Sequence, residues 1–94
     1  MEYEFDDANS AANKAKHGLD FSEAQRLWQD VDAVEIPAKS ASEPRKMLIG
    51  RIEEKTWSAI FTERKNRIRI ISVRRARTNE EAIYEQTEDQ PTES

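Results

Sequence analysis

The chain has 94 residues, a formal net charge of −4 at pH 7, one histidine and no cysteine. The length suits one domain with a modest core. The absence of cysteine excludes disulfides and thiolate metal sites. A zinc site would have to depend on carboxylates, so we expect neither a metal nor another cofactor. No apolar run approaches the roughly 20 residues of a membrane span and no signal-peptide pattern opens the sequence, so we expect a cytoplasmic protein with no membrane partner.

The first elements are predicted to be a short strand and a helix. Residues 2–5 alternate acidic and aromatic side chains, as a strand does. Asp6 or Asp7 is suited to cap a helix over residues 8–16, and Gly18 is suited to end it. This helix would place small side chains on one face, which we expect to lie close to the sheet: Ala8, Ala12 and Ala15.

A second amphipathic helix is predicted from Phe21 to about Asp30. Ser22 and Gln25 have the spacing of a capping box. Apolar side chains recur at steps of three and four residues, namely Phe21, Ala24, Leu27, Trp28 and Val31. We expect Trp28 to anchor the core rather than to stack on a ligand.

The remaining elements are predicted to be four strands and a last helix. A strand over 33–36 stops at Pro37, and a polar loop over 38–44 follows. The next three strands form an antiparallel meander with turns at 53–55 and 63–66; they cover 46–52, 57–62 and the segment that begins at Arg67. The Ile70-Ile71 doublet breaks the alternation there, which predicts either a bulge or a strand covered on both faces.

Thr78 and Glu81 have the spacing of another capping box, and the helix they begin is predicted to end near Gln86. We therefore expect one domain over residues 1–86 and an acidic, disordered tail over 87–94. The predicted fold class is α+β, in the order β-α-α-β-β-β-β-α, with helices packed on an antiparallel sheet.

Charge is distributed unevenly along the chain. Residues 1–43 contain 4 Lys/Arg and 10 Asp/Glu, residues 44–77 contain 11 and 3, and residues 78–94 contain none and 6. A folded sheet that carries a balance of +8 in an acidic chain points to a polyanion or an acidic partner. The alternative is that the acidic segments neutralise the sheet within the molecule.

The basic strands contain residue types that metal-free RNA cleavage requires. That reaction needs a base for the 2′-hydroxyl, cations for the phosphorane and an acid for the leaving oxygen. His17 and Glu63 are candidate bases, and Tyr84 could donate a proton or stack on a nucleobase. The side chains that could clamp phosphate are Arg45, Arg64, Arg67, Arg74 and Arg75. Structural alternatives are a helix cap for His17, a turn partner for Glu63 and a core position for Tyr84.

Three segments resemble the BrnT family of type II toxin–antitoxin ribonucleases, which have a RelE-like fold. The first contains Phe5-Asp6, Lys16-His17-Gly18 and Glu23-Ala24. The second contains Arg45 and Ile49-Gly50-Arg51. The third contains Thr62-Glu63-Arg64 and Arg67-Ile68-Arg69-Ile70-Ile71-Ser72-Val73-Arg74-Arg75-Ala76, and ends at Tyr84. The resemblance extends over residues 4–85, in order and with comparable spacing.

The resemblance implies an endoribonuclease that restrains translation and is neutralised by a BrnA-like antitoxin with a ribbon-helix-helix DNA-binding part, in a complex that can include a toxin homodimer. Together with the charge pattern, it leads us to expect two sets of site residues. The catalytic set is Glu63, Arg64, Arg74, Arg75 and His17. The RNA-binding set is Arg45, Lys46, Arg67, Arg69 and Tyr84.

Two other readings stay open at the level of sequence. The chain departs from the family pattern at Asn9, Pro44 and Lys46, which leaves room for a homologue that has lost catalysis. The basic sheet also fits an interaction module that binds an acidic protein or a nucleic acid without cutting it. An enzyme predicts arginines that converge on one concave spot, whereas a module predicts arginines spread over a flat or convex face.

Overall fold

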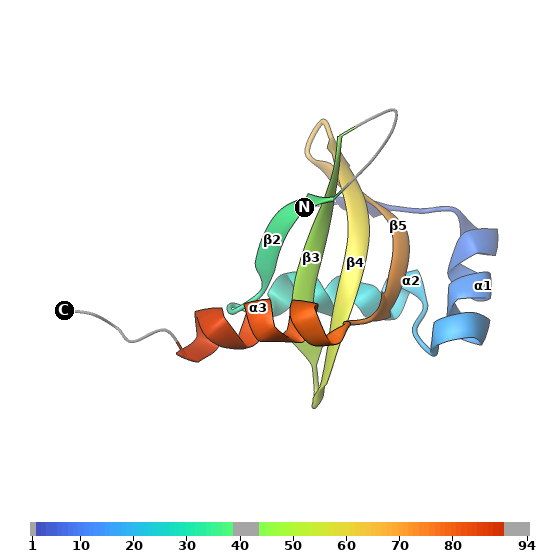
Figure 1. The fold of residues 1–94 in the computed structure, drawn as a ribbon. Coiled ribbons are helices and arrows are strands. Elements are labelled where there is room, and N and C mark those ends of the chain that lie inside the picture. Colours follow the sequence, from blue (N-terminus) through green and yellow to red (C-terminus); the bar gives the residue numbers. More distant parts are fainter. Residues whose placement is uncertain (1, 39–43, 90–94) are drawn as a thin grey trace.

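Residues 2–38 and 44–89 are described by the computed structural model of the chain (Figure 1). The elements in order are β1 (Glu2–Glu4), α1 (Asp7–His17), α2 (Phe21–Ala24), the 3₁₀ helix η1 (Gln25–Gln29), β2 (Val34–Ala38), β3 (Arg45–Ile52), β4 (Lys55–Arg64), β5 (Arg67–Arg75) and α3 (Thr78–Asp89). The α+β class and the predicted order of elements are confirmed.

The five strands form one mixed sheet in the order β1-β5-β4-β3-β2. Strands β2 to β5 pair antiparallel with their neighbours in sequence, as predicted. Strand β1 pairs parallel with β5, so the sheet is not wholly antiparallel. The helices carry the chain from this edge to the opposite edge, where β2 begins the meander. Figure 1 shows α2 behind the sheet and α3 in front of it, so helices lie on both faces.

Helix α1 begins and ends as predicted but packs through a different face. Asp6 caps it by accepting a hydrogen bond from the Asn9 amide, and Gly18 ends it with φ 89°, a conformation that favours glycine. The predicted alanine face is wrong, because those three alanines are exposed and Ser10 and Asn13 are buried instead. Both polar side chains make hydrogen bonds to backbone groups, which makes their burial favourable.

The second helical segment is capped two residues earlier than predicted. Asp20 and Glu23 form the capping box that was predicted for Ser22 and Gln25. One α-helical turn continues as the 3₁₀ helix η1, and the backbone becomes extended at Asp30. Val31 therefore lies beyond the helical repeat. It is 95% exposed, so its predicted place on the apolar face of the helix is wrong.

Strands β4 and β5 meet at a tighter turn than predicted. The turn consists of Lys65 and Asn66, whose φ values of 43° and 70° suit a two-residue hairpin turn. Glu63 and Arg64 thus belong to β4 and not to the turn. In β5 the register shifts: Ile60 pairs with Ser72, while Phe61 pairs with Ile70. The bulge predicted from the isoleucine doublet is therefore confirmed, with Ile71 as the extra residue.

Two other boundaries differ from the predictions. Strand β2 continues through Pro37 to Ala38, which an edge strand permits because its outer amides need no partner. Helix α3 continues to Asp89, beyond its predicted end near Gln86. Residues 39–43 of the predicted loop and 90–94 of the predicted tail lie outside the described residues. No described helix is long and apolar enough to cross a membrane.

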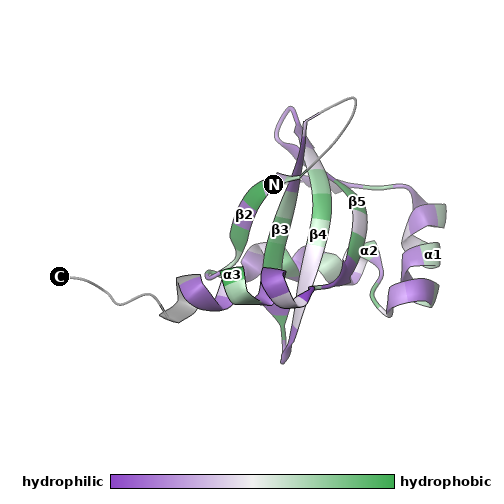
Figure 2. Ribbon diagram, in the orientation of Figure 1, coloured by the Kyte–Doolittle hydropathy of each residue, from purple (hydrophilic) through white to green (hydrophobic). Residues whose placement is uncertain are grey.

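The core lies between the sheet and the helices α2 and η1. Its fully buried side chains include Phe21, Leu27, Phe61 and Val73. Trp28 packs edge-on against Phe61, with ring centroids 5.2 Å apart, so the predicted core position of Trp28 is confirmed. Figure 2 shows hydrophobic bands along the middle of the strands and hydrophilic residues at the turn that joins β4 and β5.

Candidate functional site

Alternation along the strands gives the sheet two different faces. The core face packs on α2 and η1 through side chains such as Leu48, Ala59 and Phe61. The opposite face, called the open face below, is crossed by α3 near the end where β3 joins β4 (Figure 1). The pairing register places these side chains on the open face beyond α3: Ile36, Arg45, Met47, Ile60, Thr62, Arg64, Arg67 and Arg69.

Six of the predicted site residues lie together at the end of the sheet where β4 joins β5. We call them the strand-end cluster: Arg45, Lys46, Glu63, Arg64, Arg67 and Arg69. Arg64 and Arg67 pair across the two-residue turn, and Arg69 pairs with Thr62 on β4. Short-range hairpin pairing therefore collects charges from three strands at one end, the four arginines on the open face and Lys46 and Glu63 on the core face.

Glu63 is the acidic member of the strand-end cluster. It is exposed and accepts a hydrogen bond of 2.7 Å from Lys46 Nζ, which also lies 3.1 Å from Glu35. These bonds from Lys46 to Glu63 and Glu35 raise the pKa of the lysine, so it stays cationic. A cavity of about 240 Å³, several times the roughly 30 Å³ of one water, is lined by Glu63, Asn66, Arg67 and Ile68. Glu63 and Arg67 thus border one hollow.

The arginines of β5 make ion pairs with the first strand. Arg67 lies 3.2 Å from Glu2 and 3.5 Å from Glu4, and Arg69 lies 3.4 Å from Glu4. The Arg67 side chain is 56% exposed, and exposed pairs of this kind contribute little to stability. These carboxylates therefore partly neutralise the arginines of β5 on the open face.

Thr62 is a candidate residue that the sequence analysis missed. It is only 4% exposed, and its Oγ1 finds no hydrogen-bond partner among the described residues. Arg45 Nε is in the same situation. The register that pairs Lys46 with Phe61 places Arg45 and Thr62 opposite one another. Threonine is common in strands, so its type and spacing alone contain no signal for a site.

Arg74 lies under α3, toward the other end of the sheet. Its guanidinium donates two hydrogen bonds of 2.8 Å to Glu80, one to each carboxylate oxygen. Ser58 Oγ and the Arg77 amide also donate to Glu80. The bonds from Arg74 lower the pKa of Glu80 to about 2, although burial acts in the opposite direction. In this structure Arg74 therefore attaches α3 to the sheet.

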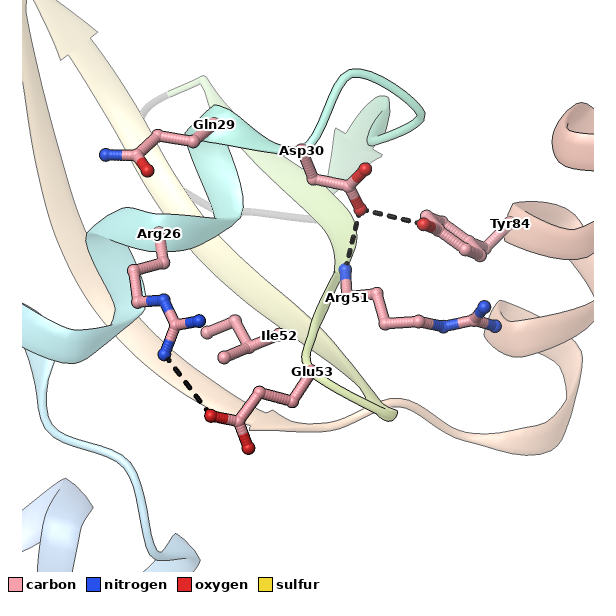
Figure 3. A pocket seen from close by; sticks show the side chains of 7 residues that line it. All are labelled: Arg26, Gln29, Asp30, Arg51, Ile52, Glu53 and Tyr84. Carbon is pink, nitrogen blue, oxygen red and sulfur yellow. Dashed lines mark hydrogen bonds and ion pairs between the residues drawn. The ribbon is translucent and has the colours of Figure 1, made fainter.

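Tyr84 also attaches α3, as Figure 3 shows. Its hydroxyl donates to Asp30 Oδ2 at 2.8 Å, and the Arg51 guanidinium lies 4.8 Å from the centre of its ring. Burial raises the pKa of Asp30, but hydrogen bonds from Asp32, Arg51 and Tyr84 outweigh burial and lower it overall. Asp30, Arg51 and Tyr84 line a polar cavity of about 430 Å³, together with residues that include Arg26 and Glu53.

Arg75 lies on the core face of the sheet, and His17 lies on α1, which packs along β5. Arg75 pairs with Trp57 of the core face, and its guanidinium lies 5.6 Å from the centre of that ring. His17 is half-buried in the last turn of α1, where the helix dipole favours a cation.

The ten predicted residues are thus not all in one place. Glu63 and Ser58, the strand partner of Arg74, are five residues apart on β4, which corresponds to about 17 Å. One phosphate cannot contact both Glu63 and Arg74 over that distance. The strand-end cluster brings a carboxylate, an ammonium and four guanidiniums to one end of the sheet, with Glu63 and Lys46 on the core face and the arginines on the open face. Nowhere in the described part of the chain do three or more His, Asp or Glu side chains form a group that could hold a metal ion.

Comparison with protein families gives one result. The model of the BrnT family, described as the ribonuclease toxin of a type II toxin–antitoxin system, matches residues 5–80. A search of curated proteins found no match to this chain.

Proposed function

Because the chain belongs to the BrnT family of ribonuclease toxins of type II toxin–antitoxin systems, we propose that it is an endoribonuclease that cuts RNA at the strand-end cluster. Family membership supports RNA as the substrate. The observation that supports the location is the cavity that Glu63 and Arg67 border at the turn between β4 and β5.

In the proposed reaction Glu63 is the general base. Its carboxylate takes the proton of a ribose 2′-hydroxyl, and the 2′-oxygen attacks the adjacent phosphorus. The bond to the 5′-oxygen breaks, and that oxygen takes a proton from solvent, which reaches this exposed end. One fragment then ends in a 2′,3′-cyclic phosphate, and the other begins with a 5′-hydroxyl.

Cations of the strand-end cluster stabilise the charge that develops on the phosphorane. Arg64 and Arg67 pair across the turn, and Arg67 lines the cavity with Glu63. Lys46 lies within reach of both Glu35 and Glu63. It therefore keeps one carboxylate partner when Glu63 takes a proton, so that protonation does not leave the lysine without a counter-charge.

The proposed reaction uses no metal. The support is the composition, since one histidine and no cysteine offer few ligands beyond carboxylates. The protein is also proposed to act in the cytoplasm, where it restrains translation. Its antitoxin partner is proposed to be BrnA-like, with a ribbon-helix-helix DNA-binding part. The basic strands would suit an acidic segment of such a partner.

Expression in a bacterial host tests this function. The wild-type chain should arrest growth, and Glu63→Gln should restore it, because the amide keeps the size of the side chain but cannot accept the 2′-hydroxyl proton. Growth curves after induction measure the effect, with protein levels compared by immunoblot.

The matched control is Glu54→Gln, an exposed carboxylate in the turn between β3 and β4. This variant should arrest growth as fully as the wild type. If Glu63→Gln is produced at the wild-type level and is equally toxic, Glu63 is not the base.

A further inference from the structure

We propose that Arg45, Thr62 and Arg69 form a phosphate-binding subsite on the open face, which holds the RNA backbone beside the cutting site. The inference rests on the proposed function, because it identifies the part of the RNA that this face binds. It assigns Thr62 a role that neither the family match nor the charge pattern indicates.

The three residues form one row across three strands. Thr62 pairs with Arg69 of β5, and the register of β3 and β4 places Arg45 on its other side. Adjacent strands are about 4.8 Å apart, so the row spans about 10 Å between its outer strands. Two arginine side chains that lean toward a central threonine can reach one phosphate over that distance.

The hydroxyl of Thr62 and the Nε of Arg45 have no hydrogen-bond partners within the described ranges 2–38 and 44–89. Buried polar atoms in native proteins are nearly always paired, so two orphans side by side call for an explanation. Both atoms can donate, and an anion with several acceptor oxygens would satisfy them together. A third donor group, the Arg69 guanidinium, stands next to Thr62 in the row.

The surroundings favour a phosphodiester of RNA over a free anion. Met47 and Ile60, both half-buried on the open face, form the next row toward α3. Their apolar surface can receive the ribose and base attached to a bound phosphate. Arg64 and Arg67 form the next row on the opposite side, at the turn between β4 and β5. Glu63 projects from the core face at this same end, so an RNA backbone held here can continue around the end of the sheet to the cavity that Glu63 borders.

Binding requires a side chain to move, because both orphan atoms are closed to solvent. Arg69 is well suited to this movement. Its side chain is 38% exposed, and its bond to Glu4 is long, at 3.4 Å. When a phosphate replaces Glu4, the guanidinium can turn toward it and uncover Thr62.

The test is the affinity for a 2′-O-methyl RNA oligonucleotide, which cannot supply a 2′-hydroxyl and so is not cut. Fluorescence anisotropy measures Kd for the wild type, Thr62→Val and Thr62→Ser. The valine variant should bind about tenfold more weakly, because it loses one hydrogen bond to a charged group. Thr62→Ser retains the hydroxyl and should bind within about threefold of the wild type.

Thermal unfolding of the same variants separates this role from damage to the fold. Thr62→Val removes an unsatisfied buried hydroxyl and keeps the branched shape, so Tm should stay the same or rise while affinity falls. The control is Thr56→Val, on the same strand, where the hydroxyl already accepts a hydrogen bond from Arg51 Nε. It should leave the Kd for RNA within about twofold of the wild type.

An unchanged Kd in Thr62→Val overturns the subsite, and so does an equal loss of affinity in Thr56→Val. The failure of the subsite and that of the proposed function are distinguishable. If Thr62 controls RNA affinity but unmodified RNA is never cut, the subsite stands and the catalytic function is wrong. If RNA is cut but Thr62→Val binds like the wild type, the function stands and the subsite is wrong.

Discussion

Asn13 illustrates how one buried polar side chain connects distant parts of this fold. Its amide donates hydrogen bonds of 2.8 Å to the carbonyls of Leu19 and Val73, and its oxygen accepts one of 3.2 Å from the Val73 amide. Helical periodicity favoured a packed alanine face on α1, because periodicity compares only apolar with polar residues. The partner of Asn13 lies 60 residues away, so no local pattern could identify this contact.

Replacing Asn13 should therefore destabilise the protein strongly. In Asn13→Ala the backbone groups of Val73 and the carbonyl of Leu19 lose their partners, and we expect a loss of about 2–4 kcal/mol in the free energy of unfolding. Urea denaturation measures it. Asn9→Ala, an exposed change on the same helix, should cost less than about 0.5 kcal/mol. Equal stability of the two variants would contradict the role assigned to Asn13.

Local sequence patterns also failed to identify the distant contacts of some predicted site residues. Resemblance and charge placed Glu63, Arg64 and Arg67 among the candidates, and local hairpin pairing was enough to gather them. Arg74 had the same appearance in the sequence, but in the structure it is bound to Glu80 under α3. The sequence pattern around a strand arginine is the same whether its side chain binds a phosphate or a carboxylate on a neighbouring helix. Only the docking of α3, which no periodicity specified, distinguishes the two.

At the scale of elements, α3 is attached to the sheet mainly by polar contacts. Near its start Glu80 joins Arg74 and Ser58, and further along Tyr84 joins Asp30. The antiparallel pairing of β3, β4 and β5 and the bulge in β5 followed from alternation and turn chemistry. The transition from α2 to η1 and the burial of Glu80 did not, because both depend on packing between distant segments.

The attachment of α3 should make stability depend on pH. The pKa of Glu80 is lowered from 4.5 to about 2 in the folded chain, so its contribution is complete above about pH 4.5 and is lost as pH falls toward 2. The contribution is about 3 kcal/mol, since one pKa unit corresponds to roughly 1.36 kcal/mol. Glu80→Gln should lose about 2–3 kcal/mol at pH 7 and show a weaker dependence on pH below 4.5.

Urea denaturation at pH 7 and at pH 3 checks this prediction. The control is Glu85→Gln, an exposed residue on the same helix, which should keep the wild-type dependence. If Glu80→Gln and the wild type lose stability equally between pH 7 and pH 3, the ion pair with Arg74 is not the cause of the acid sensitivity.

At the scale of the whole molecule, the uneven distribution of charge along the chain places most of the basic residues on the sheet. The basic segment 44–77 forms β3 to β5, and acidic groups of the flanking segments partly neutralise it: Glu2 and Glu4 pair with Arg67 and Arg69, and Glu80 pairs with Arg74. Intramolecular neutralisation, one of the two alternatives left open by the sequence, is thus present, and it includes Arg67 and Arg69 of the strand-end cluster. A polyanion that binds this end would have to displace the exposed ion pairs of Arg67.

The most direct test of the account is the cleavage of end-labelled RNA by the purified protein in EDTA, with Glu63→Gln alongside. We predict that the wild type produces fragments with 2′,3′-cyclic phosphate and 5′-hydroxyl ends, and that Glu63→Gln is slower by about 100-fold or more, the range expected for loss of a general base. Cleavage that stops in EDTA and returns with magnesium would contradict the account, and so would a Glu63→Gln variant as active as the wild type.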